Sequence, residues 1–215
     1  GMSLTGLSQI DAAGGADTVI GSAGDDTIVG GSGNDFLDGS DGGDTYLVAG
    51  TNDGTDIFRD SGATGIDRIV AGANDAIIRM SAEFSAALSG IEVITADGHT
   101  GVRVLGGNGA DLLDFSGIGL TGVAQIDGGR GADTVIGSDG DDVIVGGAGN
   151  DSIDGGAGRD VASFAGTMAS YSITPDGNTV RVQDLDAATN GDDGTDSLFG
   201  GTGSDLLVDG GYTAQ

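Results

Sequence analysis

Aspartates recur at a fixed spacing along the chain, and their carboxylates are the feature of this sequence best suited to chemistry. In the segment GGSGNDFLD (30–38), an aspartate holds the sixth place of a nine-residue pattern, Gly-Gly-x-Gly-x-Asp-x-apolar-x. The pattern continues in frame through 12–47 and returns in a second run through 128–163. Carboxylates and main-chain carbonyls are hard oxygen donors, so this pattern favours the binding of a hard cation.

Other copies of the nonapeptide lie outside the two runs. Full copies are GGNGADLLD (106–114) and GGTGSDLLV (200–208), and weaker ones are GATGIDRIV (62–70) and GDDGTDSLF (191–199). Repetition of this kind is the signature of a solenoid or array.

A longer period is superimposed on the nonapeptide. LTGLSQID at 4–11 returns as LTGVAQID at 120–127, an offset of 116 residues, and the nonapeptide runs follow at the same offset. We therefore predict two modules, 4–119 and a partial second module 120–215, joined in one continuous solenoid.

The composition supports a partner of positive charge. The 215 residues carry a net charge of −27, with 46 glycines, and among the 34 acidic residues only Glu83 and Glu92 are glutamate. Such a charge argues against nucleic acid or an anionic membrane as a partner and favours counter-cations. The chain has no cysteine and a single histidine, His99, which excludes disulfides and a conventional structural zinc site.

The repeat length predicts how the aspartates are positioned. Six residues of turn and three of strand make half a coil, so two nonapeptides close a coil of 18 residues. Glycines allow positive φ angles in the turns, which direct several carbonyl oxygens into a small volume. Coils stacked about 4.8 Å apart then bring oxygens of two turns around one point. Six or more oxygens there suit Ca²⁺ better than Mg²⁺, which gives up its water reluctantly.

The eighth-place residues are expected to point inward and form a thin core. They are Val19, Ile28, Leu37, Tyr46, Val135, Ile144, Ile153 and Ala162. Burial of one side chain per strand hardly offsets the cost of ordering so many glycines, so we predict that folding is coupled to calcium binding. The ninth-place Ile20, Val29, Ile136 and Val145 point outward and either lie beneath neighbouring segments or form a strip that binds a partner.

Segments outside the runs have a different pattern. Short β-rich stretches joined by turns fill 71–105, and Ser81 is expected to cap a short helix that reaches Leu88 and stops at Gly90. A C-terminal β-hairpin is predicted from YSIT (171–174) and TVRVQ (179–183). The fold class is therefore all-β.

The nonapeptide resembles the RTX family of hemolysin-type calcium-binding repeats. The resemblance implies a right-handed parallel β-roll, or β-helix solenoid, with calcium-bound turns. It also implies that one turn supplies its second- and fourth-place carbonyls and its aspartate, and that the turn 18 residues later supplies its first- and third-place carbonyls and its aspartate. Carried over by position, at least four calcium sites are expected: Ala13, Gly15 and Asp17 with Gly30, Ser32 and Asp35; Ser22, Gly24 and Asp26 with Gly39, Asp41 and Asp44; Gly129, Gly131 and Asp133 with Gly146, Ala148 and Asp151; Ser138, Gly140 and Asp142 with Gly155, Ala157 and Asp160.

A fifth site requires a bulged coil, because Asp111 lies 22 residues before Asp133. Its ligands would be Gly107, Gly109, Asp111, Gly128, Arg130 and Asp133. After Asp44 the next turn is irregular, so either Asp53 or Asp56 closes a site around Gly31 and Gly33. Asp205 has a full motif but no partner in frame.

The resemblance implies a calcium-binding structural module of a secreted or cell-surface protein of a Gram-negative bacterium. No basic stretch followed by an apolar run marks a signal peptide, as in proteins that leave by the type I route. No segment is apolar enough to span a membrane. We expect no catalytic residues, since nearly every aspartate has a place in a turn. Two alternatives stay open: an accessory module of an extracellular epimerase or protease that binds polysaccharide weakly, and a spacer that contacts neighbouring repeat modules.

Overall fold

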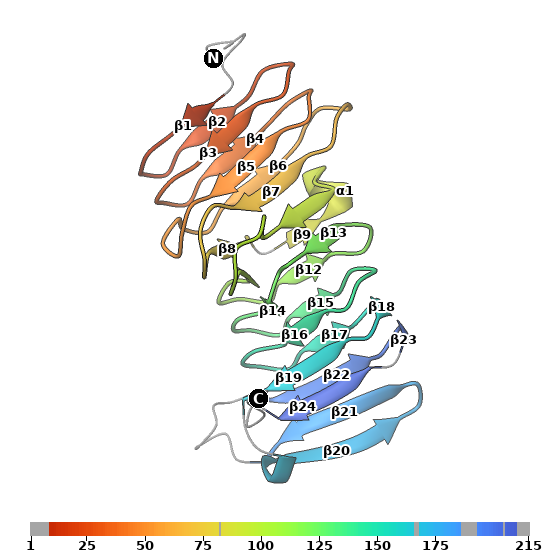
Figure 1. Cartoon of the computed structure of the whole chain (residues 1–215). Coiled ribbons are helices and arrows are strands. Elements are labelled where there is room, and N and C mark those ends of the chain that lie inside the picture. Colours follow the sequence, from red (N-terminus) through yellow and green to blue (C-terminus); the bar gives the residue numbers. More distant parts are fainter. Residues whose placement is uncertain (1–8, 82, 166–167, 186–192, 204, 210–215) are drawn as a thin grey trace.

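Short parallel strands stack into an elongated solenoid (Figure 1). The computed structural model describes residues 9–81, 83–165, 168–185, 193–203 and 205–209. Within them the strand pairs are parallel, except β20–β21 and β21–β22 near the C-terminus. The predicted all-β parallel solenoid is confirmed, whereas its right hand stays an expectation from the resemblance.

Four sheets form the walls of the solenoid. In order across each sheet, sheet 1 holds β1 (Ile10–Asp11), β3 (Thr27–Val29), β5 (Thr45–Val48), β7 (Arg68–Ala71), β10 (Val93–Thr95) and β13 (Gly119–Thr121). Sheet 2 holds β2 (Thr18–Ile20), β4 (Phe36–Asp38) and β6 (Ile57–Arg59). Sheet 3 holds β8 (Ile77–Arg79), β11 (Arg103–Leu105), β14 (Gln125–Asp127), β16 (Val143–Val145), β19 (Val161–Phe164) and β24 (Leu206–Asp209). Sheet 4 holds β9 (Glu83–Ser85), β12 (Leu112–Asp114), β15 (Thr134–Ile136), β17 (Ser152–Asp154), β22 (Thr195–Phe199), β21 (Thr179–Asp184) and β20 (Tyr171–Asp176).

The solenoid is two-sided at its ends and three-sided in the middle. The first coils have one strand in sheet 1 and one in sheet 2, and the last have one in sheet 3 and one in sheet 4. Between them, the coils that begin at β7, β10 and β13 place a strand in each of sheets 1, 3 and 4. The nonapeptide runs build the two-sided coils, because nine residues suffice for one turn and one strand.

The core lies between the sheets, and the predicted inward register is correct. Seven of the eight predicted eighth-place side chains are buried, and Ala162 is half-buried against a smaller C-terminal cluster. The middle coils have a thicker core than the runs, with Phe84 and Phe115 in contact at 5.6 Å between ring centroids. Of the ninth-place residues, Ile20 is 56% exposed, and the other three are half-buried.

The helix is shorter than predicted, and a different serine caps it. Helix α1 spans Ala86–Ser89 and is capped by Ser85, whose Oγ accepts from the backbone N–H of Leu88, rather than by Ser81. The preceding residues form β9, because Phe84 pairs with Leu113 and is buried in the core. Gly90 ends the helix in the left-handed region, as predicted.

The predicted C-terminal hairpin is present and extends sheet 4. Strands β20 and β21 are joined by the turn at Gly177, and β21 pairs antiparallel with β22. The strands run further than expected, since Pro175 lies within β20. Proline is tolerated there because β20 is an edge strand. A short 3₁₀ turn at Met168–Ser170 precedes the hairpin. The two-residue strands β18 (Ala157–Gly158) and β23 (Thr202–Gly203), one on each side of the hairpin in the sequence, pair with each other.

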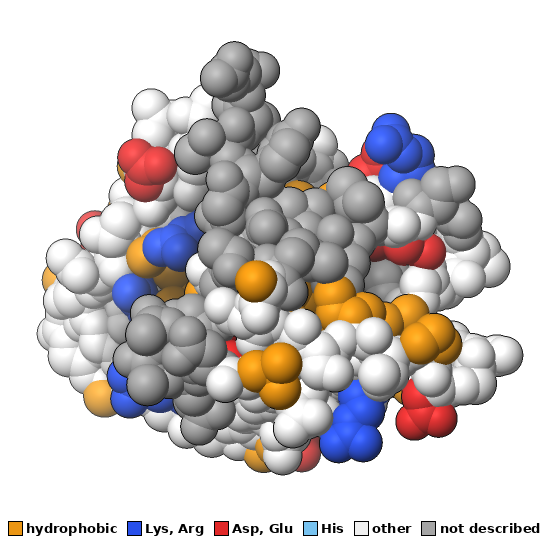
Figure 2. Space-filling view, turned by 90° about the horizontal axis from the view of Figure 1, so that it is seen from below, with side chains coloured by type: hydrophobic (Ala, Val, Ile, Leu, Met, Phe, Trp, Pro, Cys, Tyr) orange, Lys and Arg blue, Asp and Glu red, His pale blue; other side chains and the backbone are white. Residues whose placement is uncertain are grey.

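The end of the solenoid that carries the hairpin exposes hydrophobic side chains, seen in orange in Figure 2. A cavity of about 180 Å³ lies at this end and is lined by residues that include Val161, Val180 and Leu198.

The solenoid is continuous across the predicted boundary between modules at residue 120, since strand pairs such as β12–β15 span it. The division into two modules stays a prediction. No helix in the described part of the chain is long and apolar enough to cross a membrane.

Candidate metal centres

Sixth-place carboxylates stack into ladders that connect successive coils. In each step between aspartates, Oδ1 of one aspartate accepts from the backbone N–H of the corresponding residue one coil earlier, for example at 2.9 Å from Asp17 N to Asp35 and at 2.8 Å from Asp133 N to Asp151. One ladder ends on a glutamate, where Glu92 Oε2 accepts from Asp67 N. Four ladders result: ladder 1 (Asp17, Asp35, Asp56), ladder 2 (Asp26, Asp44, Asp67, Glu92), ladder 3 (Asp111, Asp133, Asp151, Asp196) and ladder 4 (Asp142, Asp160, Asp205).

The second carboxylate oxygen of many ladder residues is buried and has no hydrogen-bond partner. These orphaned Oδ2 atoms belong to Asp17, Asp35, Asp44, Asp133, Asp151 and Asp160. A buried carboxylate oxygen without a donor is costly. A cation bound between the turns would satisfy it, and the donors available are the carboxylate and carbonyl oxygens that Ca²⁺ prefers. The residues therefore fit a calcium ion.

Burial, with repulsion from neighbouring carboxylates, raises the pKa values of several ladder aspartates above their ordinary 3.8. Burial, as the larger cause, raises the pKa of Asp133 to about 6, and the charges of Asp151 and Asp111 add to it. The same causes raise the pKa of Asp56 to about 7 and of Asp196 to about 8. Crowded acids that hold protons this tightly are sites where a divalent cation would displace a proton.

The structure brings together the turns predicted for the first and third sites. Ser32 N donates to Ala13 O at 3.0 Å, and Gly15 N donates to Ser32 O at 2.8 Å. A Cβ added at Gly30 would lie 2.6 Å from Asp35 Oδ2, so this glycine lies against the carboxylate. The third site repeats the arrangement with Gly129, Gly131, Gly146 and Ala148. The Ala13 and Ser32 carbonyls accept inter-coil hydrogen bonds, and each keeps a second lone pair for a ligand.

The second, fourth and fifth predicted sites differ from the first and third, because Oδ2 of one of their aspartates already accepts hydrogen bonds. Asp26 Oδ2 accepts from both N and Oγ of Ser22, at 2.7 and 2.9 Å. Asp142 accepts from Ser138 in the same way, and Asp111 Oδ2 accepts from Gly107 N. The Oδ2 atoms of these aspartates therefore accept hydrogen bonds from residues of their own turn, so an ion bound there would replace existing hydrogen bonds.

The partner turns of these three sites still stack as predicted. Ala157 N donates to Ser138 O at 3.1 Å, and Arg130 N donates to Gly107 O at 3.1 Å. The remaining predicted residues lie at the same turn-to-turn contacts: Gly39 against Gly21, Gly24 against Gly42, Gly109 against Gly131, Gly128 against Gly106, Gly140 against Gly158 and Gly155 against Gly137. The side chain of Asp41 is engaged elsewhere, since its Oδ1 accepts from Ala63 N.

The irregular turns contain ladder residues that the sequence left undecided or missed. Asp56, rather than Asp53, continues ladder 1, because its Oδ1 accepts from Asp35 N. Asp205 Oδ1 accepts from the backbone N–H of Asp160, which lies 45 residues earlier. Sequence reasoning missed Asp67 and Asp196, although each holds the sixth place of a weak copy. The signal was present, but their partners lie 23 and 45 residues away instead of 18.

This set of buried acidic ladders on a parallel β-solenoid defines a class of protein built from stacked cation-binding turns. The family model of the RTX calcium-binding nonapeptide repeat (4 copies) matches residues 11–46, 127–162 and 190–211. The chain thus carries several copies of the RTX calcium-binding nonapeptide repeat. The search of curated proteins finds no relative of this chain.

Proposed function

We propose that this chain is a non-catalytic RTX module that folds on binding extracellular Ca²⁺ and serves as a structural part of a secreted or cell-surface bacterial protein. The observation that carries the proposal is the set of six buried Oδ2 atoms without hydrogen-bond partners among the residues that the structure describes. Folding without a cation would bury these charges uncompensated, on a chain whose net charge is −27.

Low cytosolic calcium and millimolar extracellular calcium would make such folding directional. Extracellular calcium modules bind with dissociation constants of about 10⁻⁴–10⁻³ M. The chain would then stay largely unfolded inside the cell and order itself outside, since metal binding supplies folding free energy.

A circular dichroism titration tests this function directly. The full chain is followed from chelator into millimolar Ca²⁺, with Mg²⁺ at the same concentration as the control. We expect the β-sheet signal to rise cooperatively with Ca²⁺ and little with Mg²⁺. A full β-sheet spectrum in chelator, unchanged by calcium, would refute the proposal.

Arginines on sheet 3 and in the turn after β14 support a second candidate function, weak binding of an acidic polysaccharide. Two neighbouring hollows of about 510 and 610 Å³ are lined in part by Arg79 and Arg130, and by Arg103. Acidic Asp127 and Asp75 also line them, so the binding would be weak. Calorimetry with an oligouronate and with a neutral oligosaccharide tests it: the Arg103→Gln variant should weaken oligouronate binding, and no binding by the native chain would exclude it.

A further inference from the structure

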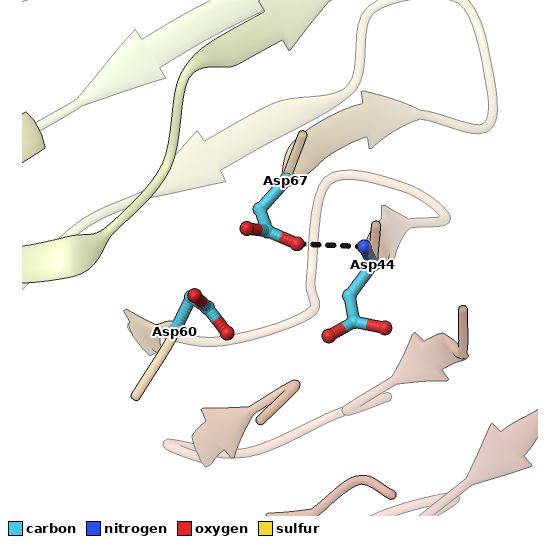
Figure 3. Close-up of side chains that lie close together, drawn as sticks. All are labelled: Asp44, Asp60 and Asp67. Atoms are coloured by element: carbon cyan, nitrogen blue, oxygen red, sulfur yellow. Dashed lines mark hydrogen bonds between the residues drawn. The ribbon is translucent and has the colours of Figure 1, made fainter. Parts of the chain in front are cut away.

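Three carboxylates meet at the coil where the two-sided solenoid becomes three-sided. One oxygen each from Asp44, Asp60 and Asp67 lie within 4.8 Å of one another (Figure 3). Asp44 and Asp67 are buried neighbours in ladder 2, with 2.6 Å from Asp44 N to Asp67 Oδ1, and Asp60 is half-buried. Asp60 belongs to no nonapeptide copy.

Asp60 occupies a place that glycine holds in the regular turns. Asp38 pairs in register with Arg59, so Asp60 aligns with Gly39, the first-place glycine of the preceding turn. At the first-place glycines, an added Cβ would lie 2.1–2.9 Å from Oδ2 of the aspartate in the same turn. A regular turn therefore has little room for a first-place side chain beside its aspartate.

The turn after β6 is longer, and the extra length accommodates a third carboxylate. Asp67 lies seven positions after Asp60, whereas Asp44 lies five positions after Gly39. The backbone of Asp60 is also held in place, because its N–H donates to Ser89 O at the end of α1, at 2.5 Å. This hydrogen bond fixes the backbone position from which the Asp60 side chain extends toward Asp44 and Asp67.

The cluster lacks an internal donor for one of its buried oxygens. Asp44 is fully buried, its Oδ1 accepts from Asp26 N, and its Oδ2 has no hydrogen-bond partner. The nearby hydroxyl of Tyr46 does not supply one, since it donates to Arg59 O and accepts from Gly39 N. An unpartnered buried oxygen on a carboxylate that lies close to two further carboxylates indicates a cation ligand.

We propose that Asp44, Asp60 and Asp67 form a three-carboxylate cation site that takes Ca²⁺ at a lower free concentration than the two-aspartate sites, and that also accepts trivalent lanthanides. The site rests on the proposed function, because two of its ligands belong to a repeat ladder. Its higher affinity follows from charge: ligand charge count sets the affinity of calcium sites, and a third carboxylate adds attraction for the ion.

Terbium luminescence provides the test, because Tb³⁺ substitutes for Ca²⁺ and is excited through nearby tyrosine. Tyr46 is close enough that the charges of Asp60, Asp44 and Asp67 contribute to the raised pKa of its phenol. The metal-free full chain is titrated with Tb³⁺, and Ca²⁺ is then added as a competitor. We expect an early luminescence step that Tyr46→Phe suppresses and Tyr171→Phe leaves in place.

Two substitutions at Asp60 decide the proposal. Asp60→Asn keeps the side-chain size, and Asp60→Gly restores the glycine of the regular turns. Both should weaken the early Tb³⁺ and Ca²⁺ step by about tenfold and leave the later steps unchanged. Asp97→Asn removes the same charge from an exposed turn and should change neither.

The outcomes separate this site from the function it rests on. Circular dichroism at saturating Ca²⁺ confirms that both Asp60 variants fold as the native chain does. If the native chain binds several ions and both Asp60 variants keep the early step, the three-carboxylate site is wrong and the RTX function stands. If the native chain binds no cation at all, both proposals fail.

Discussion

Several ladder aspartates use one carboxylate oxygen to connect neighbouring coils and bury the other without a hydrogen-bond partner. Oδ1 of Asp133 accepts from Asp111 N and so connects two coils, whereas its Oδ2 is buried without a partner. The stacking of coils thus brings the negative charges together, and a cation that neutralises them stabilises the same stacking.

Substitution of Asp133 separates the two roles. Asparagine keeps an acceptor for Asp111 N but removes the charge, so Asp133→Asn should weaken calcium binding about tenfold at this ladder and lower stability in calcium by about 1–3 kcal/mol. Calorimetry and thermal unfolding in millimolar Ca²⁺ measure both effects. Asp139→Asn, at an exposed position of the same run, is the matched control, and an equal loss from both variants would contradict the prediction.

The pH dependence follows from the raised pKa values. Burial raises the pKa of Asp44 and Asp160 from 3.8 to about 6, of Asp56 to about 7 and of Asp196 to about 8. The metal-free folded state therefore binds more protons than the unfolded chain above pH 3.8. Its stability is greatest in acid and falls as the pH rises through 6 to 8.

Calcium binding should show the opposite trend with pH, because protons and Ca²⁺ compete for the same carboxylates. We expect residual structure in chelator to be greater at about pH 5 than at about pH 8.5, and the calcium affinity to be lower at the acidic pH. Circular dichroism with chelator and calcium titrations at both pH values measures the two trends. Metal-free structure that increases with pH would show that the ladder carboxyls do not titrate as described.

The stacking of regular turns could be predicted from sequence, because their aspartates recur every 18 residues. The structure confirms this in the contact between Asp17 and Asp35. Asp196 could not be paired with Asp151, because the inserted hairpin separates them by 45 residues. Asp60 carries no motif at all and is recognised only from its place beside Asp44 in three dimensions.

At the scale of the turn, glycines at the same place of the motif face different surroundings. Gly149 and Gly109 both hold the fourth place of a full copy. Gly149 has φ +133°, and an added Cβ would lie 1.5 Å from Gly131 O, whereas an added Cβ at Gly109 meets nothing within 4 Å. Glycine is thus required at the fourth place where the backbone of the preceding coil lies against it, as at Gly149, and is not required at Gly109.

Alanine substitutions at these two positions should differ sharply. Gly149→Ala should destabilise the calcium-bound protein by about 2–4 kcal/mol, through backbone strain and a clash between coils. Gly109→Ala should change stability by less than about 1 kcal/mol. Thermal unfolding in saturating Ca²⁺ compares them, and similar melting temperatures for the two variants would argue against the stacking described.

Some elements could be predicted from local signals, whereas others depend on tertiary pairing. The hairpin follows from β-rich stretches around a turn that contains Gly177, and Gly90 ends α1 as expected. The flanking serine and glycine predict a helix that includes Glu83–Ser85, yet this segment is a strand because Phe84 packs into the core opposite Leu113. The three-sided coils have no short repeat and could not be foreseen.

At the scale of the whole molecule, the hairpin protects one end of sheet 4. Strand β21 pairs with β22 and covers its backbone, and a small cluster of Phe164, Tyr171 and Val182 secures the hairpin. An uncovered edge strand is a template for pairing with another chain. The hairpin therefore acts as a cap on the solenoid.

Unfolding the cap should cause self-association. Val182→Asp places a charge in the buried cluster and should release the hairpin, at a local cost of about 3 kcal/mol. Val180→Asp is the control, since Val180 is 36% exposed on the same strand. Sedimentation velocity in Ca²⁺ should show concentration-dependent oligomers for Val182→Asp alone, and two monomeric variants would count against a capping role.

The three-sided middle of the solenoid has a consequence for the order of assembly. Its inner surface is lined by aliphatic and aromatic side chains, with Ile69, Ile94 and Val104 fully buried, so hydrophobic burial contributes more to the stability of this segment than to that of the nonapeptide runs. We expect it to persist in chelator as a seed, visible as slow amide exchange around Val104 beside rapid exchange around Ile144. When Ca²⁺ binds, coils of the two nonapeptide runs can then add to opposite ends of this preformed segment, ladders 1 and 2 toward the N-terminus and ladders 3 and 4 toward the C-terminus.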